Sequence, residues 1–321
     1  MNILVTGANG YVGKALVKRL LASGRPGPDT IPFSRLTCVD LGSDPTLQDD
    51  ARLRYVTGSI ADPAVLEKAL DEPVDLAFHL ASLNSRQTET DTDLGRRVNL
   101  DATLQLFDGL RRQARGARLV FSSSISVYGA PLPAYIDDHT PLIPALSYGA
   151  HKQACEILLA DYSRRGWLNG RAVRLPTIVA RPPAADGSAL STFASDLIRA
   201  LASGQRYTCP VSANATMWLM SLPCCINNLL HAADVAENGL PAGRALTLPA
   251  LQASIGQLID ALAQLRGPSV RELIDYRPDP TLEAQFGRMP PLATALADRL
   301  GFCHDGSLAQ LIDRSLVALS T

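Results

Sequence analysis

Residues 6–13 read TGANGYVG and place Gly7, Gly10 and Gly13 at intervals of three residues. The residues before this stretch are apolar, as in a buried strand, and residues 11–24 have the apolar spacing of a helix. Glycine permits a tight turn and lets a pyrophosphate approach the backbone N–H groups at the N-terminus of a helix. The stretch therefore predicts a nucleotide-binding strand–turn–helix. The alternative interpretation is a glycine-rich turn without a ligand.

Short apolar runs alternate with helical stretches through the first half of the chain. The apolar runs cover 36–41, 53–58, 75–82, 117–124 and 170–179, and the helical patterns cover 63–72, 91–115 and 147–166. This alternation predicts right-handed βαβ units and an α/β fold with a Rossmann-type, doubly wound parallel sheet. Ser147 is expected to be the N-cap of the helix that begins there.

The alternation of strand and helix patterns ends after Pro176, and short helical patterns with little strand signal follow. We therefore expect a nucleotide-binding Rossmann domain over 1–176 and a smaller, mixed substrate lobe over 177–321, with interleaved segments.

Bulk composition narrows the classes of function. The 321 residues carry a formal net charge of -1 and no block of lysine or arginine, so neither nucleic acid nor a membrane is expected as a partner. The six cysteines form no CxxC pair and the five histidines are scattered, so no metal site is expected. Buried free thiols, without a signal-peptide or membrane-spanning pattern, favour a cytoplasmic location.

Asp40 ends the second predicted strand, in CVDL. A carboxylate at this point accepts hydrogen bonds from the adenosine ribose hydroxyls and repels a 2′-phosphate. No arginine follows before Arg52, so NAD is expected as the cofactor rather than NADP. The alternative is a turn carboxylate without a ligand.

Tyr148 and Lys152 are four residues apart in a predicted helix and so lie on one face. A phenol is too weak an acid to serve as a base near neutrality, but an adjacent ammonium and a nicotinamide cation both stabilise the phenolate. Such a pair can remove a hydroxyl proton while hydride leaves the same carbon. The same spacing is common on solvated helix faces, so the pair is informative only together with other groups.

Ser122, Ser123 and Ser124 follow an apolar run at the expected carboxyl edge of a central strand. Open α/β sheets bind ligands at this edge, so a serine hydroxyl here can hold a substrate oxygen against Tyr148. For Ser122 and Ser123, capping a turn is an equal alternative.

The motifs TGANGYVG, VD, HLAS, VNLDAT, FSSSISVYG and YGAHK occur in this order over the first 180 residues. As a set they resemble the extended short-chain dehydrogenase/reductases, which include nucleotide-sugar epimerases and dehydratases. The resemblance implies that Ser124, Tyr148 and Lys152 are catalytic, that Asn99 supports Lys152 through water, and that Lys152 also grips the nicotinamide ribose.

The same resemblance implies a set of cofactor contacts. They are Gly7, Asn9, Gly10, Tyr11, Val12, Gly13, Asp40, Leu41, Ser59, Ile60, Leu80, Ala81, Ser82, Asn99, Ser122, Tyr148, Lys152, Pro176 and Thr177. Ser59 stands where many family members have an acid that touches adenine, whereas Ile60 and Asp62 keep the family pattern.

The second half of the chain contains DYSRRGWLNGRAVRLPTIVARP, TFASDLIRALASG, CPV, WLMS and NNLLHAA. Together these segments, over about residues 155–250, resemble the D-erythronate dehydrogenase subgroup. The resemblance implies oxidation of the C2 hydroxyl of a four-carbon sugar acid to the 2-oxo acid with NAD. The chain departs from the subgroup at 83–92, 182–190 and 199–202, segments that we expect to shape the substrate pocket. A guanidinium matches a carboxylate best. The candidate partners of the substrate carboxylate are Arg181, Arg199 and Arg86, and the candidates for hydroxyl contacts or for closing the pocket are Ser191, Trp218 and Ser221. A surface ion pair is the alternative for each arginine, and core packing for Trp218.

Two other functions compete with a sugar-acid dehydrogenase. A nucleotide-sugar epimerase or dehydratase shares the motifs, although SSSIS lacks the acidic residue that dehydratases add near the tyrosine. A non-catalytic NAD-sensing protein is the other; such proteins often lose the tyrosine or the lysine, and this chain keeps both. By analogy with the family we expect a homodimer that pairs through helices at about 91–115 and 147–165, which the apolar stripe LQLFDGL permits.

Overall fold

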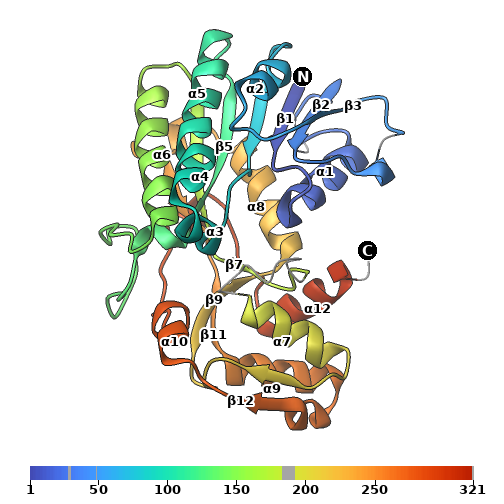
Figure 1. The fold of residues 1–321 in the computed structure, drawn as a ribbon, viewed down its shortest axis with the longest axis vertical. Coiled ribbons are helices and arrows are strands. Elements are labelled where there is room, and N and C mark those ends of the chain that lie inside the picture. The colour runs from blue at the N-terminus through green and yellow to red at the C-terminus, as the bar shows by residue number, and fades with distance from the viewer. Residues whose placement is uncertain (28–29, 48, 183–191, 320–321) are drawn as a thin grey trace. The chain divides into compact units, whose positions relative to one another are not determined.

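The computed structural model describes residues 1–27, 30–47, 49–182 and 192–319 (Figure 1). The chain divides into two compact units. The first comprises 1–127, 144–174 and 226–246, and the second comprises 128–143, 175–225 and 247–321. The units are interleaved in sequence, because 128–143 and 226–246 lie in the units opposite to those that a single boundary after Pro176 would give.

Within the described residues, the sheet of the first unit has seven strands in the order β10-β6-β5-β4-β1-β2-β3. Their bounds are β1 (Asn2–Thr6), β2 (Arg35–Asp40), β3 (Leu53–Thr57), β4 (Leu76–His79), β5 (Arg118–Ser124), β6 (Asn169–Leu175) and β10 (Ala245–Thr247). β1 pairs in parallel with β2 on one side and with β4 on the other. The strand order therefore reverses between β1 and β4, and ligands of such sheets bind outside the carboxyl ends of the strands at this point. The predicted α/β, doubly wound class is confirmed.

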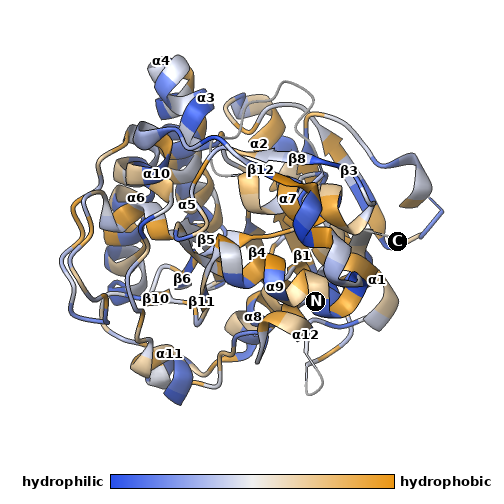
Figure 2. Ribbon diagram, turned by 90° about the horizontal axis from the view of Figure 1, so that it is seen from below, coloured by the Kyte–Doolittle hydropathy of each residue, from blue (hydrophilic) through white to orange (hydrophobic). Residues whose placement is uncertain are grey.

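Helices cover both faces of this sheet. The helices of the first unit are α1 (Tyr11–Ser23), α2 (Pro63–Ala69), α3 (Ser85–Thr90), α4 (Thr92–Arg96), α5 (Ala102–Arg112), α6 (Ser147–Arg164) and most of α8 (Leu222–Asp234). Apolar residues of α2, α5 and α6 form one core with the strands, and Figure 1 shows α1 and α8 on the other face. Figure 2 shows hydrophobic residues concentrated on β1 and β4. None of the helices in the described ranges is long and apolar enough to cross a membrane.

The helix expected over 91–115 is interrupted. A π-helical turn, Arg97–Asp101, separates α4 from α5 and contains Asn99. Leu106, Phe107 and Leu110 of the apolar stripe are buried in the core of the first unit. Most of the stripe therefore packs against the sheet, because the apolar face of α5 is the face that the sheet covers.

The prediction that Ser147 is the N-cap of α6 is wrong. Leu146 is the N-cap, and Ser147 is the first helical residue. The backbone N–H of Ser147 donates to Oε1 of Glu89 over 2.7 Å. A carboxylate from α3 thus satisfies one of the N–H groups that a capping side chain would otherwise bind.

The apolar run at 170–179 also divides into two elements. β6 ends at Leu175 and β7 (Thr177–Ile178) begins after Pro176, which has no N–H for a ladder hydrogen bond. β6 belongs to the large sheet and β7 to a three-stranded sheet, β11-β9-β7, of the second unit.

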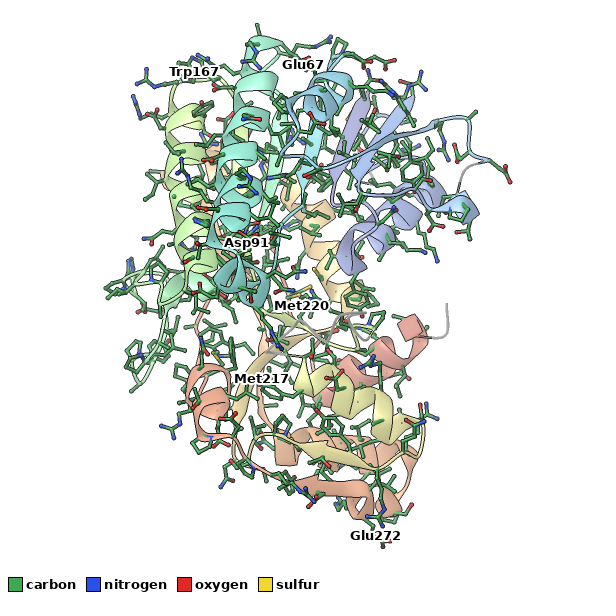
Figure 3. The ribbon with its side chains drawn as sticks, viewed as in Figure 1. Glu67, Asp91, Trp167, Met217, Met220 and Glu272 are labelled. Carbon is green, nitrogen blue, oxygen red and sulfur yellow. The ribbon has the colours of Figure 1, made fainter. Side chains whose placement is uncertain are left out.

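The second unit contains more strand than the sequence predicts. Its further strands are β8 (Tyr207–Cys209), β9 (Thr216–Met220), β11 (Leu251–Ser254) and β12 (Ile274–Tyr276), and its helices are α7 (Phe193–Ala202), α9 (Ile255–Arg266), α10 (Pro280–Phe286), α11 (Ala295–Arg299) and α12 (Leu308–Leu319). Met217 and Met220 of β9 are buried (Figure 3). The strands escape prediction because each spans only a few residues, too short a window for a period of two to stand out.

Candidate active site

The glycine turn packs directly on the loop that follows β4. Gly7 has a φ of 71°, and its N–H donates to the carbonyl of Val39 over 2.9 Å. A Cβ at Gly7 would lie 2.6 Å from the nitrogen of Ala81, and one at Gly13 would overlap the carbonyl oxygen of Gly7. Side chains are thus excluded from a cradle at the N-terminus of α1, where Gly10 is the N-cap. This cradle fits a pyrophosphate.

Asp40 is held at the tip of β2 by the backbone of the same turn. Its Oδ2 accepts the N–H of Asn9 over 2.8 Å, and its Oδ1 accepts the N–H of Leu41 over 2.7 Å. Each carboxylate oxygen keeps a further acceptor site, which fits the two hydroxyls of an adenosine ribose. The carboxylate is therefore oriented before any ligand binds.

Lys14, one turn into α1, is paired with an acid. Its Nζ lies 2.7 Å from Oδ2 of Asp44, whose side chain is almost fully buried. Hydrogen bonds from Lys14 and Thr46 lower the pKa of Asp44 to about 2, so its carboxylate stays charged at neutral pH. The Lys14 ammonium is thereby neutralised close to the tip of β2, where a 2′-phosphate would need a cation. This pairing fits NAD better than NADP.

The other residues predicted to contact the adenosine side have structural partners. The hydroxyl of Ser59 accepts the N–H of Ala61 over 3.2 Å, and the carboxylate of Asp62 caps α2. Ile60 is buried in the core, whereas Leu41 is exposed. Their roles toward adenine stay predictions.

The residues after β4 line the turn. The N–H of Leu80 donates to the carbonyl of Thr6 over 3.1 Å, and that of Ala81 to the hydroxyl of Thr6 over 3.4 Å. The hydroxyl of Ser82 donates to the carbonyl of Leu83 over 3.2 Å. Leu80, Ala81 and Ser82 therefore lie at the carboxyl edge next to the strand-order reversal, as the prediction requires.

Lys152 is buried on the sheet-facing side of α6, one turn after Tyr148. Its Nζ donates to the carbonyl of Ser122 over 2.7 Å and lies 4.7 Å from the ring centroid of Phe121. The same ammonium is 5.6 Å from the ring centroid of Tyr148. The structure thus brings together the phenol and the ammonium that the sequence places at i and i+4.

The three serines at the end of β5 point to different partners. The hydroxyl of Ser122 donates to the carbonyl of His79 over 3.0 Å, and that of Ser123 donates to Oε1 of Glu156 over 2.5 Å. Ser124 is half-buried, and its hydroxyl lies 3.1 Å from that of Ser126 and accepts the N–H of Ser126. Ser122 and Ser123 therefore connect strand to strand and strand to helix, whereas Ser124 stands at the carboxyl end of β5.

Glu156 and Arg174 form a buried ion pair that sequence reasoning missed. Nη2 of Arg174 lies 2.8 Å from Oε2 of Glu156, and their side chains are only 12% and 4% exposed. Together with Ser123, which directly precedes Ser124, this pair links β5, α6 and β6. Glu156 could have been suspected because it is four residues after Lys152, on the same helix face. Arg174 comes from a different element and carries no local signal.

Asn99 is buried in the π-helical turn and organises the segment after β4. Its Oδ1 accepts the N–H of Leu83 over 2.8 Å, and its Nδ2 donates to the hydroxyl of Thr88 over 3.1 Å. Its carbonyl accepts the hydroxyl of Thr103 over 2.9 Å. The predicted support of Lys152 through water stays a prediction.

Two of the predicted substrate contacts in the second unit are committed to that unit's own core. Trp218 is 1% exposed, and its Nε1 donates to the carbonyl of Pro290 over 2.7 Å. Ser221 is fully buried and donates its hydroxyl to Asp305 over 2.5 Å. Core packing, the alternative interpretation for Trp218, describes its position.

The remaining substrate candidates differ in their surroundings. Arg199 forms an ion pair with Asp196 one turn before it on α7, and Arg86 is exposed on α3. Arg181 is half-buried. Burial raises the pKa of the Cys225 thiol, and the positive charge of Arg181 partly offsets this increase. Ser191 lies outside the described residues, and so does most of segment 182–190, where the chain differs from the D-erythronate dehydrogenase subgroup. Pro176 and Thr177 lie near the beginning of segment 175–225 of the second unit, where Thr177 pairs with Leu219.

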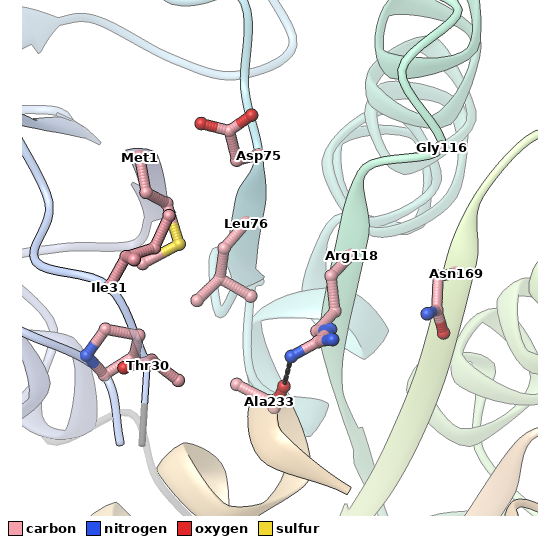
Figure 4. Close-up of a pocket in the computed structure, with 10 residues that line it drawn as sticks. Met1, Thr30, Ile31, Asp75, Leu76, Gly116, Arg118, Asn169 and Ala233 are labelled. Atoms are coloured by element: carbon pink, nitrogen blue, oxygen red, sulfur yellow. Dashed lines mark hydrogen bonds between the residues drawn. The ribbon is translucent and has the colours of Figure 1, made fainter. Parts of the chain in front are cut away.

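A pocket of about 310 Å³ opens at the opposite edge of the large sheet (Figure 4). Met1, Leu76, Arg118 and Asn169, at the amino ends of four strands, contribute to its lining. The guanidinium of Arg118 donates to the carbonyl of Ala233 there. Because the glycine turn, Ser124 and Tyr148 lie at the carboxyl edge, this pocket is separate from the candidate active site.

Comparisons with known proteins agree with these motifs along nearly the whole chain. The model of the NAD dependent epimerase/dehydratase family matches residues 3–237. The D-erythronate dehydrogenases of Cupriavidus necator and Haemophilus influenzae are 40% and 31% identical to this chain, and the matches cover 97% and 98% of both partners. The crystal structure of the nucleoside-diphosphate-sugar epimerase from Agrobacterium tumefaciens has a TM-score of 0.89 at 34% identity, over 97% of this chain and 92% of that one. The chain therefore belongs to the NAD-dependent epimerase/dehydratase family.

Proposed function

We propose that this protein oxidises the C2 hydroxyl of a four-carbon sugar acid, of the D-erythronate type, to the 2-oxo acid with NAD. The observation that carries the proposal is the 40% identity to a D-erythronate dehydrogenase over 97% of both chains. The contact between the buried Lys152 ammonium and the ring of the half-buried Tyr148 supports the same chemistry. The position of Ser124 at the carboxyl end of β5 supports it as well.

The residues would divide the binding of the cofactor among them. The turn of Gly7, Gly10 and Gly13 holds the pyrophosphate, Asp40 the adenosine ribose, and Lys152 the nicotinamide ribose. Bound NAD supplies an acceptor for the hydride that leaves C2 of the substrate.

The protein's own groups handle the proton. Ser124 donates a hydrogen bond to the substrate oxygen and holds it against the phenol. Tyr148, as phenolate, removes the hydroxyl proton while the C–H bond breaks, so the carbinol becomes a ketone. The Lys152 ammonium stabilises the phenolate, and its own position is set by the carbonyl of Ser122. Proton and hydride leave the same alcohol, which balances the two-electron oxidation.

Among the three candidate arginines we propose Arg181 as the partner of the substrate carboxylate. Arg181 is half-buried and directly precedes the segment 182–190, in which the chain departs from the D-erythronate dehydrogenase subgroup, whereas Arg86 is exposed. A half-buried guanidinium makes a stronger bidentate contact with a carboxylate than a solvated one. Replacement of Arg181 by Lys should raise the KM for the sugar acid by about tenfold or more with little change in the affinity for NAD. A KM that stays unchanged would assign the carboxylate to another residue.

The test of the reaction is the Tyr148→Phe variant, assayed as NADH formation with D-erythronate. We expect turnover to fall by about 10²–10⁴-fold while the NAD dissociation constant stays within about twofold, because only the acid–base group is lost. Tyr162→Phe is the matched control, since Tyr162 lies on the same helix but its hydroxyl donates to Asp108 over 2.8 Å. Full activity of Tyr148→Phe would refute the role of Tyr148.

A nucleotide-sugar 4-epimerase is the second candidate. The similarity to the Agrobacterium tumefaciens protein, whose structure is described as a nucleoside-diphosphate-sugar epimerase, favours it. An epimerase retains NAD through purification and converts a UDP-sugar without net NADH formation. Parallel assays of UDP-hexoses and of four- to six-carbon sugar acids separate the two functions.

We also propose a homodimer in a reducing, cytoplasmic compartment. Ile157 of α6 is 63% exposed, an apolar side chain that a partner helix would cover. Cys38, Cys155, Cys209, Cys224 and Cys225 are free and buried, as expected where disulfides do not form. Light scattering that finds a monomer at working concentration would contradict the dimer.

A further inference from the structure

A chain of hydrogen bonds runs through the interior of the first unit by way of His79. The ring nitrogen Nδ1 of His79 lies 2.6 Å from the hydroxyl of Thr6, and Nε2 lies 2.8 Å from the hydroxyl of Thr103. His79 is 1% exposed, and Thr6 and Thr103 are equally buried. No step of the proposed reaction uses this histidine.

The far end of the chain determines which ring nitrogen carries the proton. The hydroxyl of Thr103 lies 2.9 Å from the carbonyl of Asn99, which can only accept, so Thr103 gives its single proton to that carbonyl. Thr103 must then accept a hydrogen bond from His79, which requires a proton on Nε2. Nδ1 is left as the acceptor of the Thr6 hydroxyl.

The near end agrees with this direction. The hydroxyl of Thr6 accepts the N–H of Ala81 over 3.4 Å while it donates to Nδ1. Every bond from Ala81 to the carbonyl of Asn99 thus points the same way, and such chains strengthen each bond by polarisation.

The surroundings of the ring keep it uncharged. Burial and the nearby Lys152 ammonium lower the pKa of His79 to about 3. The ring also stacks on Phe121 with the centroids 5.7 Å apart. The Cys155 thiol contacts the Thr103 hydroxyl and also donates to the Asn99 carbonyl over 3.5 Å. Burial raises the pKa of Cys155 to about 11, so it stays a thiol, and its sulfur is a weaker acceptor for the Thr103 proton than the carbonyl oxygen. The arrangement around His79 is therefore independent of pH near neutrality.

His79 connects the two halves of the candidate active site. Thr6 immediately precedes Gly7, and Ala81 packs against Gly7. On the other side, Thr103 bonds to the carbonyl of Asn99. The backbone carbonyl of His79 accepts the hydroxyl of Ser122, whose own carbonyl holds Lys152.

We propose that His79 is a positioning residue whose neutral Nε2–H tautomer holds the glycine turn and the Asn99–Lys152 region in register for cofactor binding and turnover. The part of this inference that concerns turnover rests on the proposed function. The parts that concern the tautomer and cofactor affinity do not depend on which substrate the protein uses.

The first test is ¹⁵N nuclear magnetic resonance of the histidine-labelled wild-type protein, with the His79 signals assigned by their loss in the His79→Gln variant. We expect one protonated Nε2 and one unprotonated Nδ1 from about pH 5 to about pH 9, in contrast to free histidine, which titrates near pH 6.5. A ring protonated on Nδ1, or one that titrates in this range, would overturn the proposal. This measurement needs no substrate. If His79→Gln does not fold, the His79 signals are identified by elimination, from single replacements of His139, His151, His231 and His304.

The second test uses two variants that each keep one of the two hydrogen bonds made by the His79 ring. Asparagine places an acceptor near the position of Nδ1 but does not reach Thr103, so His79→Asn should keep NAD affinity within about threefold and lose about tenfold in turnover at saturating NAD. Glutamine places a donor near the position of Nε2 but leaves Thr6 without its acceptor. His79→Gln should therefore weaken NAD binding by about tenfold and change saturated turnover less.

The control for this comparison is His139→Gln, which replaces an exposed histidine of the second unit. NAD affinity is measured by calorimetry, turnover by NADH formation, and stability by thermal unfolding. If both variants lower only the unfolding temperature and leave affinity and turnover unchanged, His79 is structural and the proposal fails. If wild-type protein does not oxidise D-erythronate, the proposed function fails, whereas the tautomer and the NAD affinities still decide the role of His79.

Discussion

Replacement of Glu156 by glutamine tests how strongly the buried charges next to Ser124 are coupled. Glu156 is 4% exposed, and it receives Arg174 through Nη2 at 2.8 Å and Nε at 3.0 Å. It also accepts the hydroxyl of Ser123 over 2.5 Å. Glutamine keeps the shape of the side chain and one acceptor oxygen but removes the negative charge.

The expected loss in free energy of unfolding depends on the Arg174 charge that stays buried. Removal of one partner from a buried ion pair costs about 3–5 kcal/mol, because the remaining charge stays buried after its counter-charge is lost. The amide oxygen of glutamine can still bind either Ser123 or Arg174, so we expect the lower end, about 3 kcal/mol. At about 2–4 °C per kcal/mol for a domain of this size, the unfolding midpoint should fall by about 6–12 °C.

The assay is thermal unfolding followed by circular dichroism, with two reference variants. Glu156→Gln/Arg174→Met removes both charges, and we expect it to recover much of the loss, since no uncompensated charge stays buried. Asp161→Asn, on the same helix, breaks exposed pairs with Arg164 and Arg165 and should leave the midpoint nearly unchanged. A Glu156→Gln midpoint equal to that of the wild type, or a double variant no more stable than the single one, would refute the reasoning.

Three further changes address the cofactor site. Gly13→Ala places a Cβ against the carbonyl oxygen of Gly7 and should weaken NAD binding by about tenfold to a hundredfold in calorimetry; an unchanged affinity contradicts the cradle. Asp40→Ser removes the carboxylate that repels a 2′-phosphate and should raise the ratio of kcat/KM for NADP to that for NAD by about tenfold or more, and a constant ratio contradicts that role. The pKa of Asp44 is lowered from 3.8 to about 2, chiefly by Lys14, so its contribution to stability is present above about pH 4 and is lost as the pH falls toward 2. Between about pH 6 and about pH 2, the free energy of unfolding of Asp44→Asn should therefore fall by about 1 kcal/mol less than that of the wild type. The difference is small because Lys14 is 44% exposed. Equal acid sensitivity of the two proteins in urea unfolding would contradict a role for the Lys14–Asp44 pair.

The N-cap predicted at Ser147 shows that local sequence patterns do not determine the ends of helices. Ser147 has the residue type of a cap, and it does begin α6, but its N–H is bound by Glu89 from another helix. The helix expected over 91–115 likewise follows the apolar spacing, yet a π-helical turn interrupts it where the buried amide of Asn99 binds Leu83 and Thr88. Apolar periodicity predicts that a helix exists, whereas contacts with distant residues decide where it begins and breaks.

Local sequence patterns were enough to predict the glycine turn, the position of Asp40 at a strand end, and the shared face of Tyr148 and Lys152. These features depend on residues a few positions apart, and the geometry of a turn, a strand end or one helical turn is the same in any fold. By contrast, the folded structure alone reveals that Thr6, His79 and Thr103 form one hydrogen-bonded network and that Ser123, Glu156 and Arg174 form another. The members of each set come from different strands and helices, and their pairing arises from the order and register of the sheet, which no local period encodes.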